Sequence, residues 1–321
     1  MRYPTAAGFR RALEDRLNRQ AQETGEATMR LRKNVVFQRL LARLLAISHD
    51  RWILKGGLAL DFRLSKRGAR SRATKDMDLA RQGEPATADA DFGNVPSIGL
   101  GDHFEFIVRR VDLAPGDKEA GGAERRFHVL ATLAGRVFEE VLVDVGFTLS
   151  GTDPEPDMVE GPDLLEFADL EPVRVPALPV TFHVAEKMHA YTRLYGLRHV
   201  PSSRPKDLVD LVLLATHEPF LARDLRAALD ETFMSRATHS LPPELLPPPA
   251  AWSRPYAELA KHVGIALELV DGYEQARTFL DPVLEGSAGT DAHWDAANQI
   301  WVPSEQAADR TGRSKRGGGS T

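Results

Sequence analysis

The hydrophobic positions along the chain predict helices at both ends and a sheet between them. Within residues 28–48, Leu31, Val35 and Leu44 recur at helical spacing, and arginines fill much of the remaining surface. Other segments alternate apolar with polar residues or form short apolar runs, as strands do. We predict helices over residues 7–23, 28–48, 58–65, 181–196, 204–217, 221–233, 255–262 and 265–281, and strands over residues 51–55, 75–80, 104–111, 126–133 and 139–147.

This order of elements predicts an α+β protein with a mixed sheet that is mostly antiparallel in its later part. Residues 1–50 should be basic helices that pack on the core, and residues 51–175 should form the sheet domain. The segment 150–179 is rich in Pro, Asp and Glu and is interpreted as a connection. We expect residues 176–285 to form a helical domain and residues 286–321, which lack apolar periodicity, to be a flexible tail.

Composition narrows the class of protein without identifying it. The chain has 321 residues, of which 42% are hydrophobic and 27% are charged, as in ordinary globular proteins. No apolar run approaches the length of a membrane span, and the first residues lack the apolar centre of a secretory signal, so we expect a soluble cytoplasmic protein. There are no cysteines and the histidines show no metal-ligand spacing, so any metal would bind mainly to oxygen.

The charge is distributed unevenly along the chain. The net charge is −5, but residues 1–75 hold 18 Lys and Arg against 6 Asp and Glu, so that this part is strongly cationic and the remainder acidic. A cationic block attracts polyanions such as nucleic acid. It can equally be a solvated helical face, or a surface that docks on the acidic part of the same chain. Charge alone favours neither reading.

A double glycine, Gly56 and Gly57, stands between the first predicted strand and the helix that follows it. Glycines at the start of a helix let backbone N–H groups approach phosphate oxygens, and the helix dipole favours the negative charge. Taken alone, a Gly-Gly pair before a helix is usually only a tight turn. It becomes a candidate phosphate site because of the acidic residues that follow.

Three carboxylates lie in strand patterns. Asp76 and Asp78 alternate with apolar residues, so both should point to one face of a strand, and Asp144 lies within the apolar run "VLVDVGF". A carboxylate among apolar residues is costly unless a cation or donor pairs with it. Three that converge would suit one or two hard divalent ions, Mg²⁺ or Mn²⁺, which bridge carboxylates to substrate phosphates.

The motifs "LKGGLAL", with Arg63 after it, "TKDMDL" and "VLVDVGF" resemble the nucleotidyltransferase fold of the AbiEii/AbiGii toxin family, which includes the MenT toxins of mycobacteria. The resemblance continues in "VAEKMHAYTR", with Lys187 and Arg193, and in "RPKDLVDL", with Arg204. It spans roughly residues 50–215 with four motifs in order. One departure is that Leu58 follows the glycines where many such enzymes have a hydroxyl residue at or just after the second glycine. Thr74 is a candidate to supply a hydroxyl instead.

The resemblance implies roles for these residues. Asp76 and Asp78 would hold Mg²⁺ against the triphosphate of an NTP, and Asp144 would complete a second ion site and help to deprotonate the acceptor hydroxyl. Gly56 and Gly57 would cradle the β and γ phosphates. The remaining candidates are Lys187, Asp207 and Asp210 as catalytic residues, and Arg63, Thr74, Lys187, Arg193 and Arg204 as nucleotide-binding residues.

Ordinary structural explanations also exist for the helical motifs. Lys187 could extend to solvent from a packed helix face. Asp207 falls in the first turn of a predicted helix, where the dipole favours an acid. Asp210 lies among Leu and Val residues, so a buried carboxylate there needs a partner such as Arg204 or Lys187.

The function that the resemblance implies is that of a toxin that adds a nucleotide to the 3′ end of tRNA and so blocks translation. Its partners would be tRNA and a cognate antitoxin, in a toxin–antitoxin or phage-defence system. Two alternatives stay open. The acceptor could be a small molecule or a protein side chain, or the chain could be an inactive relic that binds RNA or a partner protein.

Overall fold

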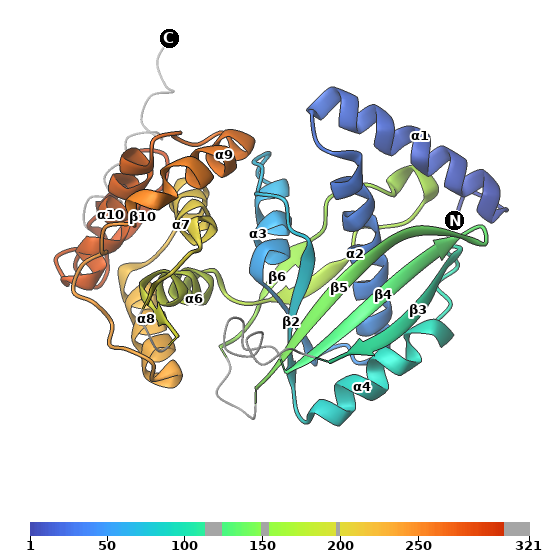
Figure 1. Ribbon diagram of the computed structural model, residues 1–321, viewed down its shortest axis with the longest axis horizontal. Helices are drawn as coiled ribbons and strands as arrows, with labels where there is room; N and C mark the ends of the chain where they lie inside the picture. The colour runs from blue at the N-terminus through green and yellow to red at the C-terminus, as the bar shows by residue number, and fades with distance from the viewer. Residues whose placement is uncertain (113–123, 149–153, 197–199, 305–321) are drawn as a thin grey trace, which may run out of the picture. The chain divides into compact units, whose positions relative to one another are not determined.

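The computed structural model describes residues 1–112, 124–148, 154–196 and 200–304. The chain divides into two compact units (Figure 1). The first unit comprises residues 1–68 and 73–178, and the second comprises residues 69–72 and those from 179 onward. The division expected from the sequence was at 175/176, and the two units meet along the chain at 178/179. The short segment 69–72, which belongs to the second unit, was not expected.

The first unit is built on a mixed sheet, which confirms the predicted fold class. Within the described residues, seven strands join in the order β3-β4-β5-β2-β1-β7-β6. The neighbours β3, β4 and β5 are antiparallel, and β2 runs parallel to β5 and antiparallel to β1. The strands are β1 (Trp52–Lys55), β2 (Asp76–Gln82), β3 (Phe104–Val111), β4 (Arg125–Leu133), β5 (Arg136–Thr148), β6 (Asp157–Glu160) and β7 (Arg174–Ala177).

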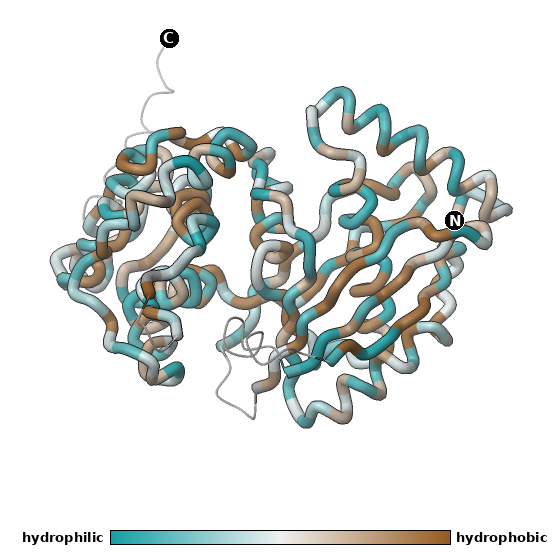
Figure 2. Tube along the Cα trace, viewed as in Figure 1, coloured by the Kyte–Doolittle hydropathy of each residue, from teal (hydrophilic) through white to brown (hydrophobic). Residues whose placement is uncertain are grey.

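One face of this sheet carries the core. Phe92 stacks on Phe127 of β4 with ring centroids 3.9 Å apart, and Phe9 meets Phe104 of β3 edge-on at 6.1 Å. Figure 2 shows that α1 is largely hydrophilic along its length, whereas the strands carry most of the hydrophobic residues in this region. The helices of the unit are α1 (Ala6–Thr24), which contributes Phe9, α2 (Thr28–Ile47), α3 (Gly56–Ser65) and α4 (Pro85–Asn94), which contributes Phe92.

The opposite face of β3, β4 and β5 carries the alternate residues and is more accessible. Ile107 and Leu142 are 47% and 39% exposed, in contrast to Phe106, Val141 and Val143, which are buried. Because side chains alternate along a strand, residues on this second face share it with Asp144.

The second unit is helical. Its helix α7 (Pro205–His217) is central, since α6 (Val180–Thr192), α9 (Ser253–Val263) and α10 (Leu269–Leu284) all pack against it. The residues from Leu208 to Ala215 are almost entirely buried, as is typical of a central helix. The unit also contains α8 (Ala222–Arg236). Its described residues form two short antiparallel strand pairs. In one, β8 (Leu194–Tyr195) pairs with β9 (Val200–Pro201), and in the other, β10 (His293–Asp295) pairs with β11 (Ile300–Val302).

The structure differs from the expected tail at residues 286–321. The strands β10 and β11 lie within this range, and Trp294 is buried, with its Nε1 donating to the Ala215 carbonyl at 2.6 Å. Two indole rings, Trp294 and Trp301, pack against Phe279 of α10. The apolar residues here are few but large, so they anchor the segment without forming a periodic pattern. Residues 305–321 lie outside the described part of the chain.

Among the described residues, no helix combines the length and apolarity that a membrane span requires.

Candidate active site

The turn between β1 and α3 lies directly against the first aspartate strand. Gly56 adopts φ of +63°, in the left-handed region that favours glycine. A Cβ added at Gly56 would lie 2.0 Å from Oδ2 of Asp78, so the carboxylate already occupies that space. In the sheet, Lys55 and Asp78 are register partners. The Gly-Gly turn and the Asp-x-Asp strand therefore meet at Gly56 and Asp78.

Asp144 lies on the same face as the other two aspartates. In the parallel pair β2–β5, Asp78 is the register partner of Asp144, and Asp76 is the partner of Leu142. Register partners point to the same face of a sheet, and Asp76 and Asp78 are two residues apart on one strand. The three carboxylates thus project from two neighbouring strands toward one side.

The carboxylate of Asp144 is bound by an arginine. Nε and Nη2 of Arg126 on β4 donate to its Oδ1 and Oδ2 at 2.6 and 2.9 Å. Strand β4 lies on one side of β5 and β2 lies on the other. The carboxylate of Asp144 thus lies in a row between a cation of β4 and a second carboxylate of β2.

The oxygen ligands match the chemistry of a hard divalent ion, but their arrangement is incomplete. Mg²⁺ and Mn²⁺ prefer carboxylate oxygens, which Asp76 and Asp78 supply from one strand. Over the residues described, no group of three or more His, Asp or Glu side chains is placed to hold a metal ion. Both oxygens of Asp144 accept from Arg126 in this arrangement. The donor chemistry of the three residues fits such an ion, because all of them supply carboxylate oxygens on one face of the sheet.

Two further candidates of the first unit have protein partners. The hydroxyl of Thr74 donates to the backbone carbonyl of Asp76 at 3.4 Å, so it lies beside the aspartate strand. Arg63 is only 8% exposed at its side chain, and it forms an ion pair with Asp157 at 2.7 Å and donates to the Leu178 carbonyl. These contacts give Arg63 a structural role in joining α3 to β6 and β7. Its role in nucleotide binding stays a prediction.

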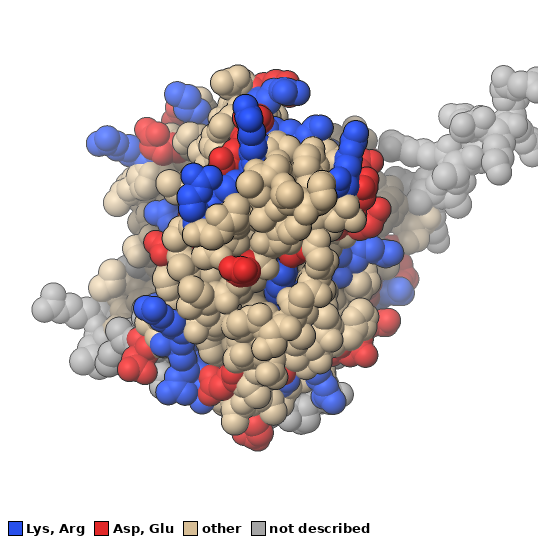
Figure 3. Space-filling view, turned by 90° about the vertical axis from the view of Figure 1, so that its right-hand side faces the viewer, with Lys and Arg blue, Asp and Glu red and all other residues tan. Residues whose placement is uncertain are grey.

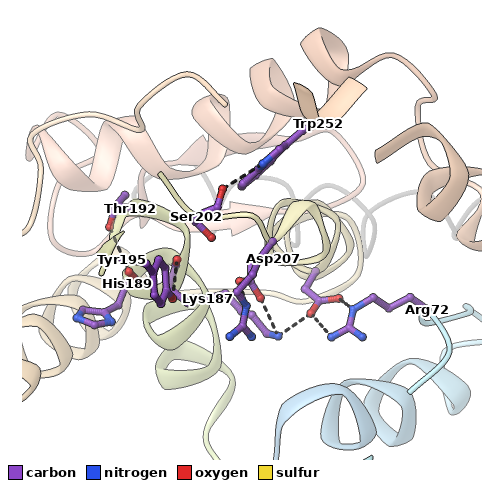
Figure 4. A network of polar contacts seen from close by, with 11 residues as sticks. Arg72, Lys187, His189, Thr192, Tyr195, Ser202, Asp207 and Trp252 are labelled. Carbon is purple, nitrogen blue, oxygen red and sulfur yellow. Dashed lines mark hydrogen bonds and ion pairs between the residues drawn. The ribbon is translucent and has the colours of Figure 1, made fainter. Parts of the chain in front are cut away.

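The helical motifs come together in the second unit as a buried ion network (Figure 4). Nζ of Lys187 on α6 lies 2.6 Å from Oδ2 of Asp210 and 3.3 Å from Oδ1 of Asp207 on α7. Arg72 donates to both oxygens of Asp210 at 2.8 and 2.9 Å. Arg204 pairs with Asp207 at 2.9 Å. Lys187 is thus buried against two carboxylates rather than extended to solvent.

The ion pairs keep these groups charged although they are buried. Burial alone would lower the pKa of Lys187, but Asp210 and Asp207 outweigh it and raise that pKa above its usual value. Burial alone would raise the pKa of Asp210, but Lys187 and Arg72 outweigh it and lower that pKa well below its usual value.

The cations of this network outnumber its carboxylates. Lys206, in the first turn of α7, is half-buried, and its pKa is lowered by burial and then by Arg204, Arg72 and Lys187. Four cationic side chains therefore surround Asp207 and Asp210. Positive charge in excess of the carboxylates, when partly shielded from water, favours the binding of an anion.

Arg193 lies at the C-terminal end of α6, where its guanidinium stacks on Tyr195 at 5.0 Å from the ring centroid. Its assignment to nucleotide binding stays a prediction.

Sequence reasoning missed Arg72, Arg126 and Lys206. No local signal marks Arg72, because it precedes β2 and its partner Asp210 lies 138 positions further along the chain. No such signal marks Arg126 either, since its position opposite Asp144 depends on the register of β4 and β5.

Many cations of the N-terminal part are paired with acids. Arg43 and Asp102 are both almost fully buried and joined by two hydrogen bonds of 2.7 and 2.9 Å. On the face that Figure 3 shows, basic and acidic side chains lie side by side around a largely uncharged centre. The cations of residues 1–75 that form ion pairs with Asp or Glu include Arg10, Arg30, Arg32, Arg39, Arg43, Arg63, Lys66 and Arg72.

The mixed sheet, the glycine turn and the strand carboxylates are the features expected of a nucleotidyltransferase. A family model described as "Nucleotidyl transferase AbiEii toxin, Type IV TA system" matches residues 39–286, which is more than half of the chain. The chain belongs to this family of nucleotidyltransferase toxins. A type IV toxin–antitoxin system implies an antitoxin as partner.

Comparison with solved structures supports the fold. MenT4, a nucleotidyltransferase toxin from Mycobacterium tuberculosis H37Rv, superposes with a TM-score of 0.55 at 16% sequence identity, over 84% of this chain and 89% of that chain. At this identity the likeness concerns the fold alone. No curated protein matches the sequence.

Proposed function

We propose that this toxin transfers a nucleotide from an NTP to the 3′ end of tRNA in a reaction that needs Mg²⁺ or Mn²⁺, and that this transfer blocks translation. The observation that carries the proposal is the meeting of the Gly56 turn with Asp78, whose register partner is Asp144. A phosphate-binding turn beside carboxylates is what nucleotidyl transfer requires, because the triphosphate and its counter-ions must be held together.

Each group has a chemical task in this proposal. Asp76 and Asp78 would hold the divalent ion, which neutralises phosphate charge when bound. Backbone N–H groups at Gly56 and Gly57 would bind the β and γ phosphates. Asp144 would accept the proton of the acceptor hydroxyl as it attacks the α phosphate, and pyrophosphate would leave.

We also propose that Lys187 and Arg204 of the second unit take part in nucleotide binding, as the resemblance implies. Lys187 remains protonated because Asp210 and Asp207 raise its pKa, so it keeps its charge at neutral pH. Arg204 and Lys206 add to this positive charge. Most of the rate enhancement in phosphoryl transfer comes from positioning and electrostatics of this kind.

The nature of the acceptor has weaker support. Many cations of residues 1–75 form ion pairs with acidic residues of the same chain, so the positive charge of this block is partly neutralised. A small-molecule or protein acceptor is the alternative that this observation favours.

One experiment separates these acceptors. The purified protein is incubated with each labelled NTP, Mg²⁺ and total tRNA at increasing salt. If tRNA becomes labelled and the amount of label falls steeply as salt increases, the result supports a polynucleotide acceptor, because binding to phosphates releases counter-ions. An absence of label in tRNA with every NTP contradicts the proposed acceptor.

A further inference from the structure

A row of four charged residues crosses the sheet at the candidate site. Arg126 on β4 is the register partner of Asp144 on β5, Asp144 is the partner of Asp78 on β2, and Asp78 is the partner of Lys55 on β1. The order of charges along the row is positive, negative, negative, positive. The two adjacent carboxylates are thus flanked by Arg126 on β4 and by Lys55 on β1.

Arg126 makes a two-pronged contact with Asp144. Its guanidinium binds both oxygens of Asp144, in the geometry that gives Arg–carboxylate pairs their strength. The pair is largely shielded, with side chains 24% and 15% exposed. Both oxygens of the Asp144 carboxylate therefore already accept a hydrogen bond from a cation.

We propose that Arg126 is a positioning residue that competes with the divalent ion for Asp144. The proposal rests on the metal-dependent transfer put forward above. Both oxygens of Asp144 accept from Arg126, so the guanidinium is a fixed positive charge beside this carboxylate. A divalent ion that uses an oxygen of Asp144 must therefore share the carboxylate with Arg126 or displace it.

The competition follows from the charges in the row. Asp78 and Asp144 are register partners on neighbouring strands, and two like charges at this spacing repel each other unless a cation compensates them. Arg126 supplies that compensation from within the chain. A divalent ion bound to the same carboxylates would supply it as well, so the positive charge of Arg126 lowers the affinity of the site for the ion.

The test measures Mn²⁺ affinity directly, by titration calorimetry with MnCl₂ and no nucleotide. In Arg126→Gln the competitor is removed, so Mn²⁺ should bind roughly three- to tenfold more tightly than in the wild-type protein, the range expected for losing one partly shielded ion pair. Arg126→Lys keeps the charge but loses the two-pronged contact, and its affinity should lie between the two.

Arg125→Gln is the matched control. Arg125 is the adjacent residue on β4, and it pairs with Asp89 of α4 at 3.3 Å rather than with a candidate site residue. Its Mn²⁺ affinity should equal that of the wild type. Adding Asp144→Asn to Arg126→Gln should remove the gain in affinity, because the gain acts through Asp144.

The outcomes distinguish this inference from the function on which it rests. Equal Mn²⁺ affinities in the wild type, Arg126→Lys and Arg126→Gln, with transferase activity in the wild type, overturn the role of Arg126 alone. Weaker Mn²⁺ binding by a folded Arg126→Gln also overturns it, since that result means that Arg126 supports the ion. An absence of both Mn²⁺ binding and transfer in the wild type contradicts the proposed function as well. Should Arg126→Gln fail to fold, the comparison of Arg126→Lys with the wild type decides.

Discussion

At the scale of single residues, the candidate site has no room for a side chain at position 56. Its φ of +63° is unfavourable for any other residue, and a Cβ there would lie 2.0 Å from the Asp78 carboxylate. Any side chain at Gly56 must therefore displace Asp78. The positive φ and the close approach of Asp78 therefore both require glycine at position 56.

We predict that Gly56→Ala lowers nucleotidyl transfer at least about tenfold, because a misplaced catalytic carboxylate costs that much or more. Gly68→Ala is the matched control, since Gly68 has a similar φ of +68° but open space where its Cβ would be. It should cost only about 1 kcal/mol of stability and leave transfer intact. The measurement is transfer rate together with thermal unfolding. Equal effects of the two variants on transfer would show that contact with Asp78 is unimportant.

Several site residues could be predicted from the sequence because their chemistry is local. The period-two alternation of Asp76 and Asp78 placed both on one face, and the apolar context of Asp210 indicated a buried ion pair. The partners of such residues are set by tertiary structure. Arg72 lies 138 positions from Asp210 along the chain, so no local pattern joins them.

At the scale of elements, α6 and α7 are joined by charges inside an apolar interface. Lys187 and Asp210 are nearly inaccessible, and Arg72 completes the pair from a short loop segment. A buried ion network of this kind stabilises little when intact, but breaking it leaves uncompensated charge.

We predict that Asp210→Asn lowers the free energy of unfolding by about 3 to 5 kcal/mol, because Lys187 and Arg72 then share one less carboxylate. The control is Asp230→Asn on α8, which breaks an exposed pair with Arg226 and should cost less than about 0.5 kcal/mol. Urea unfolding followed by circular dichroism measures both. Similar losses for the two variants would mean that the network does not hold α6 and α7 together.

The strongly periodic elements were predictable, and the short or weakly apolar ones were not. The strands of the β3–β5 meander and helices α2 and α7 follow clear patterns of apolar residues. Helix α4 was missed because its ten residues bury only Ala88, Asp91 and Phe92. Strands β6 and β7 were assigned to a connection, since four-residue strands carry too few alternations to be recognised.

At the scale of the whole molecule, the positive charge of residues 1–75 is partly neutralised by ion pairs within the fold. Arg10, Arg32 and Arg43 of α1 and α2 each contact an acid or a backbone carbonyl. The outer side of α1 still presents Arg11, Arg16 and Arg19 to solvent. A polyanionic acceptor could contact these residues on this helix.

We predict that Arg11→Glu with Arg19→Glu raises the KM for tRNA several-fold and flattens its salt dependence, because fewer counter-ions are released on binding. The KM for the NTP should stay unchanged. Arg254→Glu, an exposed change on α9, serves as the control. An unchanged KM for tRNA in the α1 variant would place the acceptor elsewhere.

The most direct test concerns Asp76, which is exposed at the start of β2 and can be changed without disturbing the core. Wild-type protein and Asp76→Ala are incubated with labelled NTP, Mg²⁺ and tRNA, and their circular dichroism and melting are compared. The account predicts incorporation by the wild type and none by a variant that is folded to the same extent. A folded Asp76→Ala that still transfers nucleotide at the wild-type rate would contradict the assignment of the aspartate strand as the catalytic centre.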